Sequence, residues 1–111
     1  MKAAEVTKAL GLQVRAGEAG LEREVTGGCV SDLLSYVMGN AHAANVWITI
    51  QVHPNIIGVA ELLDLSAIII AGGQEPEAAT LEKAQERAVT ILSAKESAFM
   101  VAGRLYELGV R

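Results

Sequence analysis

Three short, almost wholly apolar segments, each followed by a stretch with helical periodicity, constrain the fold of this chain most strongly. These segments are 46–50, 67–71 and 89–92. β-branched and aliphatic residues without polar alternation are typical of strands that are covered on both faces of a sheet. Helices of about ten residues between such strands imply right-handed crossovers and parallel pairing. The sequence therefore predicts an α/β fold of three layers (α/β/α), with a mostly parallel sheet of four to five strands.

Helices are predicted where apolar residues recur at intervals of three and four. They are expected over 2–10, 31–40, 56–63, 76–88 and 96–108. Two further strands are expected over 12–15 and 22–26, the second ending at the pair Gly27-Gly28. Several apolar stripes are expected to face the sheet: Leu33, Leu34, Val37 and Met38 in the second helix, Ala78, Leu81, Ala84 and Ala88 in the fourth, and Phe99, Ala102 and Leu105 in the last.

The composition indicates a single folded domain over residues 1–111. Two cores of half this size would each be marginal, and 51% hydrophobic residues exclude an intrinsically disordered chain. The net charge is -4 and only 4% of the residues are aromatic. Nucleic acid and an anionic membrane surface are therefore not expected as partners.

The cysteine content and the first residues bear on the cellular compartment. Cys29 is the only cysteine, so an internal disulfide is not expected. Charged residues at positions 2, 5 and 8 occupy the place where a signal peptide has its apolar stretch. The longest purely aliphatic run, 67–71, is far below the roughly 18 residues of a membrane-spanning helix. We expect a cytoplasmic protein.

Ligands of parallel sheets bind outside the carboxyl ends of the strands, where loops and helix N-termini converge. Four stretches are expected at that edge: 27–28, 51–55, 72–75 and 93–95. The candidate ligand-binding residues among them are Gln51, His53, Asn55, Gly72, Gly73 and Gln74.

The pair Gly72-Gly73 has two interpretations. Its backbone N–H groups could approach an anion at the N-terminus of the following helix, or the glycines could serve a tight turn only. The pair matches neither G-x-G-x-x-G nor G-x-x-x-x-G-K-[ST], which argues against a nucleotide fingerprint and against phosphoryl transfer. The structural interpretation is favoured.

Two other groups of residues also have a chemical and a structural interpretation. His53 could act as an acid or base beside Gln51 and Asn55, but a helix cap is the favoured role for it. Ser31-Asp32 is interpreted as a helix cap with a favourable first-turn charge rather than as a nucleophile and its helper. The cysteine and histidines lack the spacing of metal ligands, so no metal and no cofactor is expected.

Over nearly its whole length the chain resembles the DRTGG domain family, on the segments 30–34, 46–49 and 68–76. It is most similar to stand-alone, single-domain members, which are related to the N-terminal domain of HPr kinase. Gly72-Gly73 correspond to the glycines of the family motif, whereas Val52-His53 and Ala71 stand in place of its Asp-Arg pair and threonine. The resemblance implies a regulatory or assembly role and a contribution to oligomer contacts.

Together these observations predict a non-catalytic regulatory or adaptor module that forms a homodimer, contacts an unidentified protein partner and senses a small anionic metabolite or nucleotide. The alternative from a different class is a small enzyme that uses His53 as acid or base at the carboxyl edge, which requires a deep pocket there. A third, weaker alternative is a phosphocarrier kinase, against which the missing phosphate loop argues.

Overall fold

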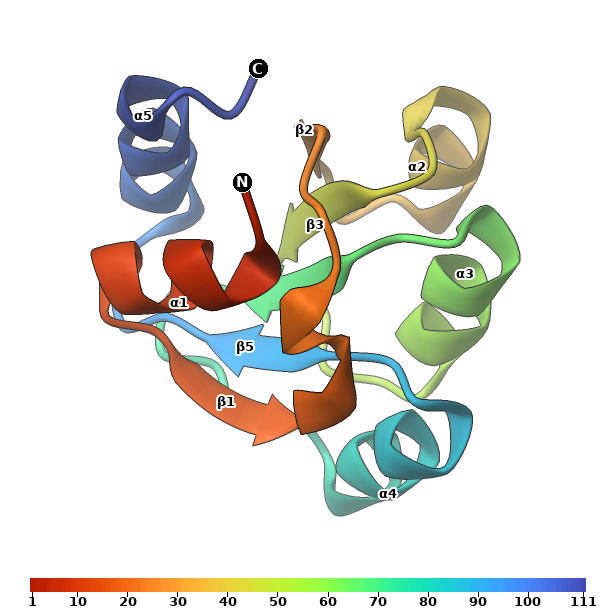
Figure 1. Ribbon diagram of the computed structural model, residues 1–111. Helices are drawn as coiled ribbons and strands as arrows, with labels where there is room; N and C mark the ends of the chain where they lie inside the picture. Colours follow the sequence, from red (N-terminus) through yellow and green to blue (C-terminus); the bar gives the residue numbers. More distant parts are fainter.

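A five-stranded sheet runs through the middle of the computed structural model, which describes residues 1–111 (Figure 1). The strands are β1 (Gln13–Ala16), β2 (Gly27–Val30), β3 (Asn45–Thr49), β4 (Ala67–Ile70) and β5 (Ile91–Ser93). The helices are α1 (Ala3–Leu10), the 3-10 helix η1 (Glu18–Glu22), α2 (Leu34–Asn40), α3 (Asn55–Leu63), α4 (Ala78–Arg87) and α5 (Ala98–Leu108). None of them has the length and apolar character that crossing a membrane requires.

The spatial order of the strands is β1-β5-β4-β3-β2, and β2 to β5 are parallel to one another. Because these four strands follow one another across the sheet in one direction, right-handed crossovers place α2, α3 and α4 on the same face. Helices α1 and α5 cover the other face (Figure 1). Strand β1 is antiparallel to β5 at one edge, and β2 forms the opposite edge. The predicted three-layer α/β/α fold with a mostly parallel sheet is confirmed.

Two hydrophobic cores lie on opposite faces of the sheet, because successive strand residues point to opposite sides. Trp47 and Ile68 belong to the core under α2, α3 and α4. Ile48 and Ile69, one residue further along their strands, belong to the core under α1 and α5. Each of these four side chains is at most 1% exposed, as expected for strands buried on both faces.

The strand predicted over 22–26 is wrong. A 3-10 helix ends at Glu22, and the strand begins at Gly27 and runs to Val30. Gly27 is needed for close packing inside the strand, because a Cβ there would lie 3.1 Å from the side-chain nitrogen of Asn45. Gly27-Gly28 therefore lie at the amino end of β2 and not, as predicted, in a loop at the carboxyl edge.

The inward-facing stripe predicted for the second helix is wrong in part. Only Val37 is buried in α2, while Leu33 is 63% and Met38 47% exposed. The helix begins at Leu34 rather than at Ser31, and it lies at the end of its layer with a helix neighbour, α3, on one side only.

The stripes predicted for the last two helices are wrong in part, although Ala84 and Leu105 are buried as predicted and Leu81 and Ala102 pack partly buried against the cores. In α4 the buried residues are Thr80 and Ala84, and Ala78 and Ala88 are exposed. In α5, Val101 and Leu105 face the sheet, whereas Phe99 is 84% exposed. Ser97 caps α5 by accepting a hydrogen bond from the N–H of Met100, so the helical phase is set from Ala98 onward.

Candidate functional site

The carboxyl ends of β2 to β5 meet at one edge of the sheet, as predicted, and the antiparallel β1 begins at the same edge. Gln13 at the start of β1 lies opposite Ser93 at the end of β5. Helix α1 is capped by Gly11 in a left-handed conformation. The turn that follows it therefore lies beside the loops that follow β4 and β5. This edge holds more elements than the four strand-to-helix loops that the sequence predicts.

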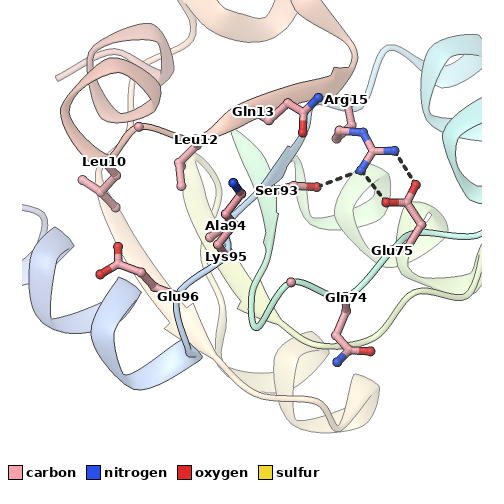
Figure 2. Close-up of a pocket in the computed structure, with 12 residues that line it drawn as sticks. Leu10, Leu12, Gln13, Arg15, Gln74, Glu75, Ser93, Ala94, Lys95 and Glu96 are labelled. Atoms are coloured by element: carbon pink, nitrogen blue, oxygen red, sulfur yellow. Dashed lines mark hydrogen bonds and ion pairs between the residues drawn. The ribbon is translucent and has the colours of Figure 1, made fainter.

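A groove of about 450 Å³ lies between the start of β1, the end of β5 and the loop from β4 to α4 (Figure 2). The polar side chains around it come from three separate parts of the chain: Gln13 and Arg15, Gln74 and Glu75, and Ser93, Lys95 and Glu96. Its volume falls within the roughly 300–1,000 Å³ of typical small-molecule sites.

Arg15 and Glu75 form a two-pronged ion pair across the groove. Arg15 Nη1 donates to Glu75 Oε1 at 2.9 Å, and Nη2 contacts the second carboxylate oxygen (Figure 2). Arg15 Nη1 also donates to Ser93 Oγ at 3.4 Å. The hydrogen bonds from Arg15 lower the pKa of Glu75 below its ordinary value of 4.5, and the same contact raises the pKa of Arg15. The guanidinium is thus held at the groove by a carboxylate that is itself largely exposed.

Lys95 is the cation of the groove that has no ion-pair partner within the protein. Its side chain is exposed and, in Figure 2, reaches toward the open space between β1 and the end of β5. The neighbouring carboxylate, Glu96, pairs instead with Arg104. Arg104 in turn donates to the carbonyl oxygens of Ala9 and Leu10, at 3.1 and 3.3 Å. Glu96 is therefore engaged in joining α5 to α1, and Lys95 has no ion-pair partner.

The Arg15–Glu75 pair predicts a pH dependence of stability. Because the pKa of Glu75 is lowered in the folded state, its contribution is present above the unfolded value of 4.5 and is lost as the pH falls through the folded value. Urea unfolding should show wild type more stable than Glu75→Gln at pH 7, by a small margin for an exposed pair, with the difference shrinking as the pH is lowered below 4.5. Glu82→Gln, which removes an exposed α4 carboxylate without an ion pair, is the control. A difference that does not shrink as the pH falls would contradict the ion-pair origin.

Gly72 and Gly73 form a structural turn. Both have positive φ, 72° and 68°, which favours glycine. The N–H of Gly72 donates to the carbonyl oxygen of Glu96 at 2.7 Å, and that of Gly73 to Ala94 at 2.9 Å. Both amides are thus engaged within the protein, in agreement with the structural interpretation. Gly73 and Gln74 do line the groove, although the Gln74 side chain points away from the other lining residues (Figure 2).

The other three predicted residues lie outside the groove. Gln51 donates to the backbone oxygen of Asp32 at 3.0 Å, and Asn55 is exposed at the start of α3. His53 Nδ1 accepts the N–H of Asn55, the first residue of α3, at 3.0 Å, while the cap position itself is taken by Pro54 and has no side-chain hydrogen bond. His53 is exposed and lines none of the three depressions in the surface, so the pocket that the enzyme hypothesis requires is not formed at this residue.

Asp32 has a different role from the predicted first-turn charge, because α2 begins two residues after it. Its Oδ1 accepts hydrogen bonds from Thr49 Oγ1 at 2.7 Å and from the N–H of Ile50 at 2.8 Å. Asp32 therefore joins the ends of β2 and β3. Ser31 Oγ accepts the N–H of Leu33 at 3.1 Å, which is a turn contact before the helix.

The single cysteine and the groups able to bind a metal form no further site. Cys29 is buried in β2, and burial raises the pKa of its thiol, which keeps it protonated and unreactive at neutral pH. No three His, Cys, Asp or Glu side chains converge on a point where a metal ion could be held. What the edge offers chemically is a groove with two cations, two carboxylates that are both engaged by arginines, and side-chain amides.

Comparisons with known proteins identify a fold. No protein-family model and no curated protein matches the sequence. In its fold, however, the chain is similar to a solved structure, that of the CBS and DRTGG domains of the regulatory region of Clostridium perfringens pyrophosphatase, complexed with the activator diadenosine tetraphosphate. The TM-score is 0.71 at 14% identity, and the match covers 93% of this chain and 46% of that chain. This chain therefore has the fold of part of a CBS and DRTGG domain region, and it spans about half of the protein it matches.

Proposed function

We propose that this chain is a non-catalytic regulatory or adaptor domain of the DRTGG type, which self-associates and binds a small anionic metabolite or nucleotide in the groove at the carboxyl edge of the sheet. The observation that carries the proposal is that two cations, Arg15 and Lys95, line the same groove. Arg15 is ion-paired with Glu75, whereas Lys95 has no ion-pair partner in the protein. The fold it shares with a regulatory region that takes a nucleotide activator supports the same assignment.

The chemistry of the groove suits phosphate or carboxylate groups. A guanidinium presents a planar fork of donors, and an ammonium adds a mobile point charge. The hydroxyl of Ser93 and the amide of Gln13 are neutral groups at the same opening. These neutral groups favour an anion with polar substituents, such as a phosphorylated metabolite.

Binding of an anion at Arg15 is coupled to the Arg15–Glu75 pair, since the carboxylate occupies the same face of the guanidinium that a phosphate would use. A ligand therefore releases Glu75 from Arg15. Glu75 sits in the loop that leads into α4, so the release is transmitted to that loop. This is the structural event that a partner protein would sense.

The proposal is tested by following the melting temperature of the protein with a panel of nucleotides and phosphorylated metabolites. A ligand at 100 times its Kd should stabilise the protein by roughly 2.7 kcal/mol. Lys95→Met should weaken binding of that ligand about tenfold, because a charged hydrogen bond contributes about 1.5–3 kcal/mol when desolvated and less in an open groove. Lys83→Met removes the same charge from a half-buried residue of α4 that does not line the groove, and it serves as the matched control.

Two outcomes count against the proposal. A panel without any shift in melting temperature would remove the sensing role and leave an adaptor only. A ligand whose affinity is the same for wild type and Lys95→Met would place its site away from this groove.

A further inference from the structure

The two edges of the sheet differ in how they are protected. Edge strands with unpaired backbone groups are normally blunted by charges, prolines or irregular pairing. Strand β1 has such protection, since it carries Arg15 and its register shifts between Val14 and Ala16. Strand β2 has the sequence GGCV, with neither charge nor proline and with regular pairing to β3. No further strand pairs with the outer side of β2 (Figure 1), and the C-terminal residue Arg111 comes within 3.7 Å of the Cβ position at Gly27.

The hydrogen bonds of β2 show which backbone groups face outward. The N–H of Ser31 donates to the carbonyl oxygen of Ile48 at 3.2 Å. In a parallel ladder alternate residues bond to the same neighbour, so Cys29 shares this direction with Ser31. Gly28 and Val30 therefore direct their N–H and C=O groups away from the sheet, where nothing in the chain pairs with them.

An apolar surface adjoins this open edge. Gly28 and Val30 line a shallow depression of about 230 Å³ together with Ala102 and Tyr106 of α5 and with Arg111, whose guanidinium lies 4.5 Å from the centre of the Tyr106 ring. Phe99 lies one helical turn before Ala102 on the same side of the helix. Val30 is 49%, Tyr106 60% and Phe99 84% exposed. We call Gly28, Val30, Phe99, Ala102 and Tyr106 the β2–α5 surface.

We propose that a second copy of this chain covers the β2–α5 surface, with the two β2 strands paired antiparallel about a two-fold axis. This inference rests on the self-association in the proposed function and assigns the surface that mediates it. A two-fold interface requires a self-complementary patch. Gly28 opposite Val30 of the other copy meets this condition, because each residue supplies one donor and one acceptor, and the glycine leaves room for the valine side chain.

The exposed area is of the order that a dimer needs. Aromatic side chains bury about 150–250 Å² each, so Phe99 and Tyr106 together present about 300 Å². Leu33 and Tyr36, in and just before the helix that contacts β2 on the other face, are 63% and 49% exposed and extend the apolar area. With Val30, the total is about 600 Å² of the roughly 800 Å² that each partner buries in a standard interface. The strand backbone supplies the remainder.

Sedimentation velocity tests the assignment. Wild type at 50 μM should sediment as a dimer, and both Val30→Lys and Phe99→Glu should raise the dimer Kd at least a hundredfold, because a charge is placed inside the contact. Leu62→Lys, a substitution at an apolar side chain of α3 that is 69% exposed, should leave the dimer intact. A monomeric wild type, or a Val30→Lys variant that still forms the wild-type dimer, overturns the proposal.

Amide hydrogen exchange of the wild type gives a second readout that needs no variant. The N–H groups of Gly28 and Val30 should exchange more slowly as the concentration is raised through the dimer Kd, while that of the exposed Gly39 should not change. Unchanged exchange at Gly28 and Val30 in a sample that is dimeric would exclude this strand. Nucleotide binding distinguishes failure of this proposal from failure of the proposed function. If monomeric Val30→Lys still binds a nucleotide at the groove, ligand sensing does not depend on the interface. If the wild-type dimer binds no nucleotide, the interface stands and the sensing role does not.

Discussion

Gly17→Ala is expected to destabilise the protein by about 4 kcal/mol, a loss large enough to unfold much of a small domain at physiological temperature. Gly17 follows β1 with φ at +69°, and a Cβ there would lie 2.3 Å from the carbonyl oxygen of Val89. Its own N–H and C=O are bound to the side chains of Gln85 and Thr90, at 3.0 and 2.7 Å. Gly17 therefore cannot shift away from Val89 without losing its hydrogen bonds to Gln85 and Thr90.

Gly11→Ala is the matched control for this prediction. Gly11 has nearly the same φ, +65°, but a Cβ there would meet nothing within 4 Å. Its substitution should cost only the backbone penalty of about 1–2 kcal/mol for a left-handed alanine. Urea unfolding of the two variants measures the difference. Equal destabilisation would show that φ alone matters, and that the close approach of Val89 does not.

Trp47→Ala is expected to cost about 4 kcal/mol, within the range of about 3–5 kcal/mol for removal of a buried aromatic side chain. Trp47 lies in the central part of β3, is fully buried under α2, α3 and α4, and donates from Nε1 to the carbonyl oxygen of Ser31 at 2.8 Å. The side chain therefore both fills the core and joins the loop after β2 to the sheet.

Trp47→Phe separates these two contributions. It keeps most of the volume and loses the hydrogen bond, so it should cost clearly less than the alanine variant, about 2 kcal/mol. Leu62→Ala, which truncates an apolar side chain of α3 that is 69% exposed and lies outside the proposed interface, should cost less than 1 kcal/mol. Denaturant midpoints report all three values. A Trp47→Ala variant as stable as Leu62→Ala would be incompatible with the packing around β3.

The long-range ion pair explains why the candidate site was predicted only in part. Arg15 and Glu75 are 60 residues apart in the chain, and they meet because β1 turns antiparallel to β5. A weak four-residue strand gives no sign of its pairing partner or direction. Lys95 could have been predicted from the sequence as a residue of this edge, since it follows the last strand. That it has no ion-pair partner could not, because this depends on the pairing of Glu96 with Arg104. The direction of the Gln74 side chain was not foreseeable.

Local glycine and helix signals were ambiguous for a related reason. Gly27-Gly28 resemble a turn in sequence, but they belong to an edge strand because they pair in parallel with Asn45 and Val46 of β3. Phe99 is apolar and one turn away from Ala102, yet the helix turns it outward because Val101 and Leu105 take the inner positions. A periodic pattern leaves a rotation of one residue open when both sides of a helix are apolar.

The amino-acid sequence by itself determined the class of fold and the order of its main elements, because strands that are apolar on both faces are stable only between two helical layers. The tertiary structure alone decided which polar groups share the groove and which edge strand is left open. Those outcomes depend on the pairing direction of β1 and on contacts between residues far apart in the chain, and neither is encoded in any local pattern of side chains.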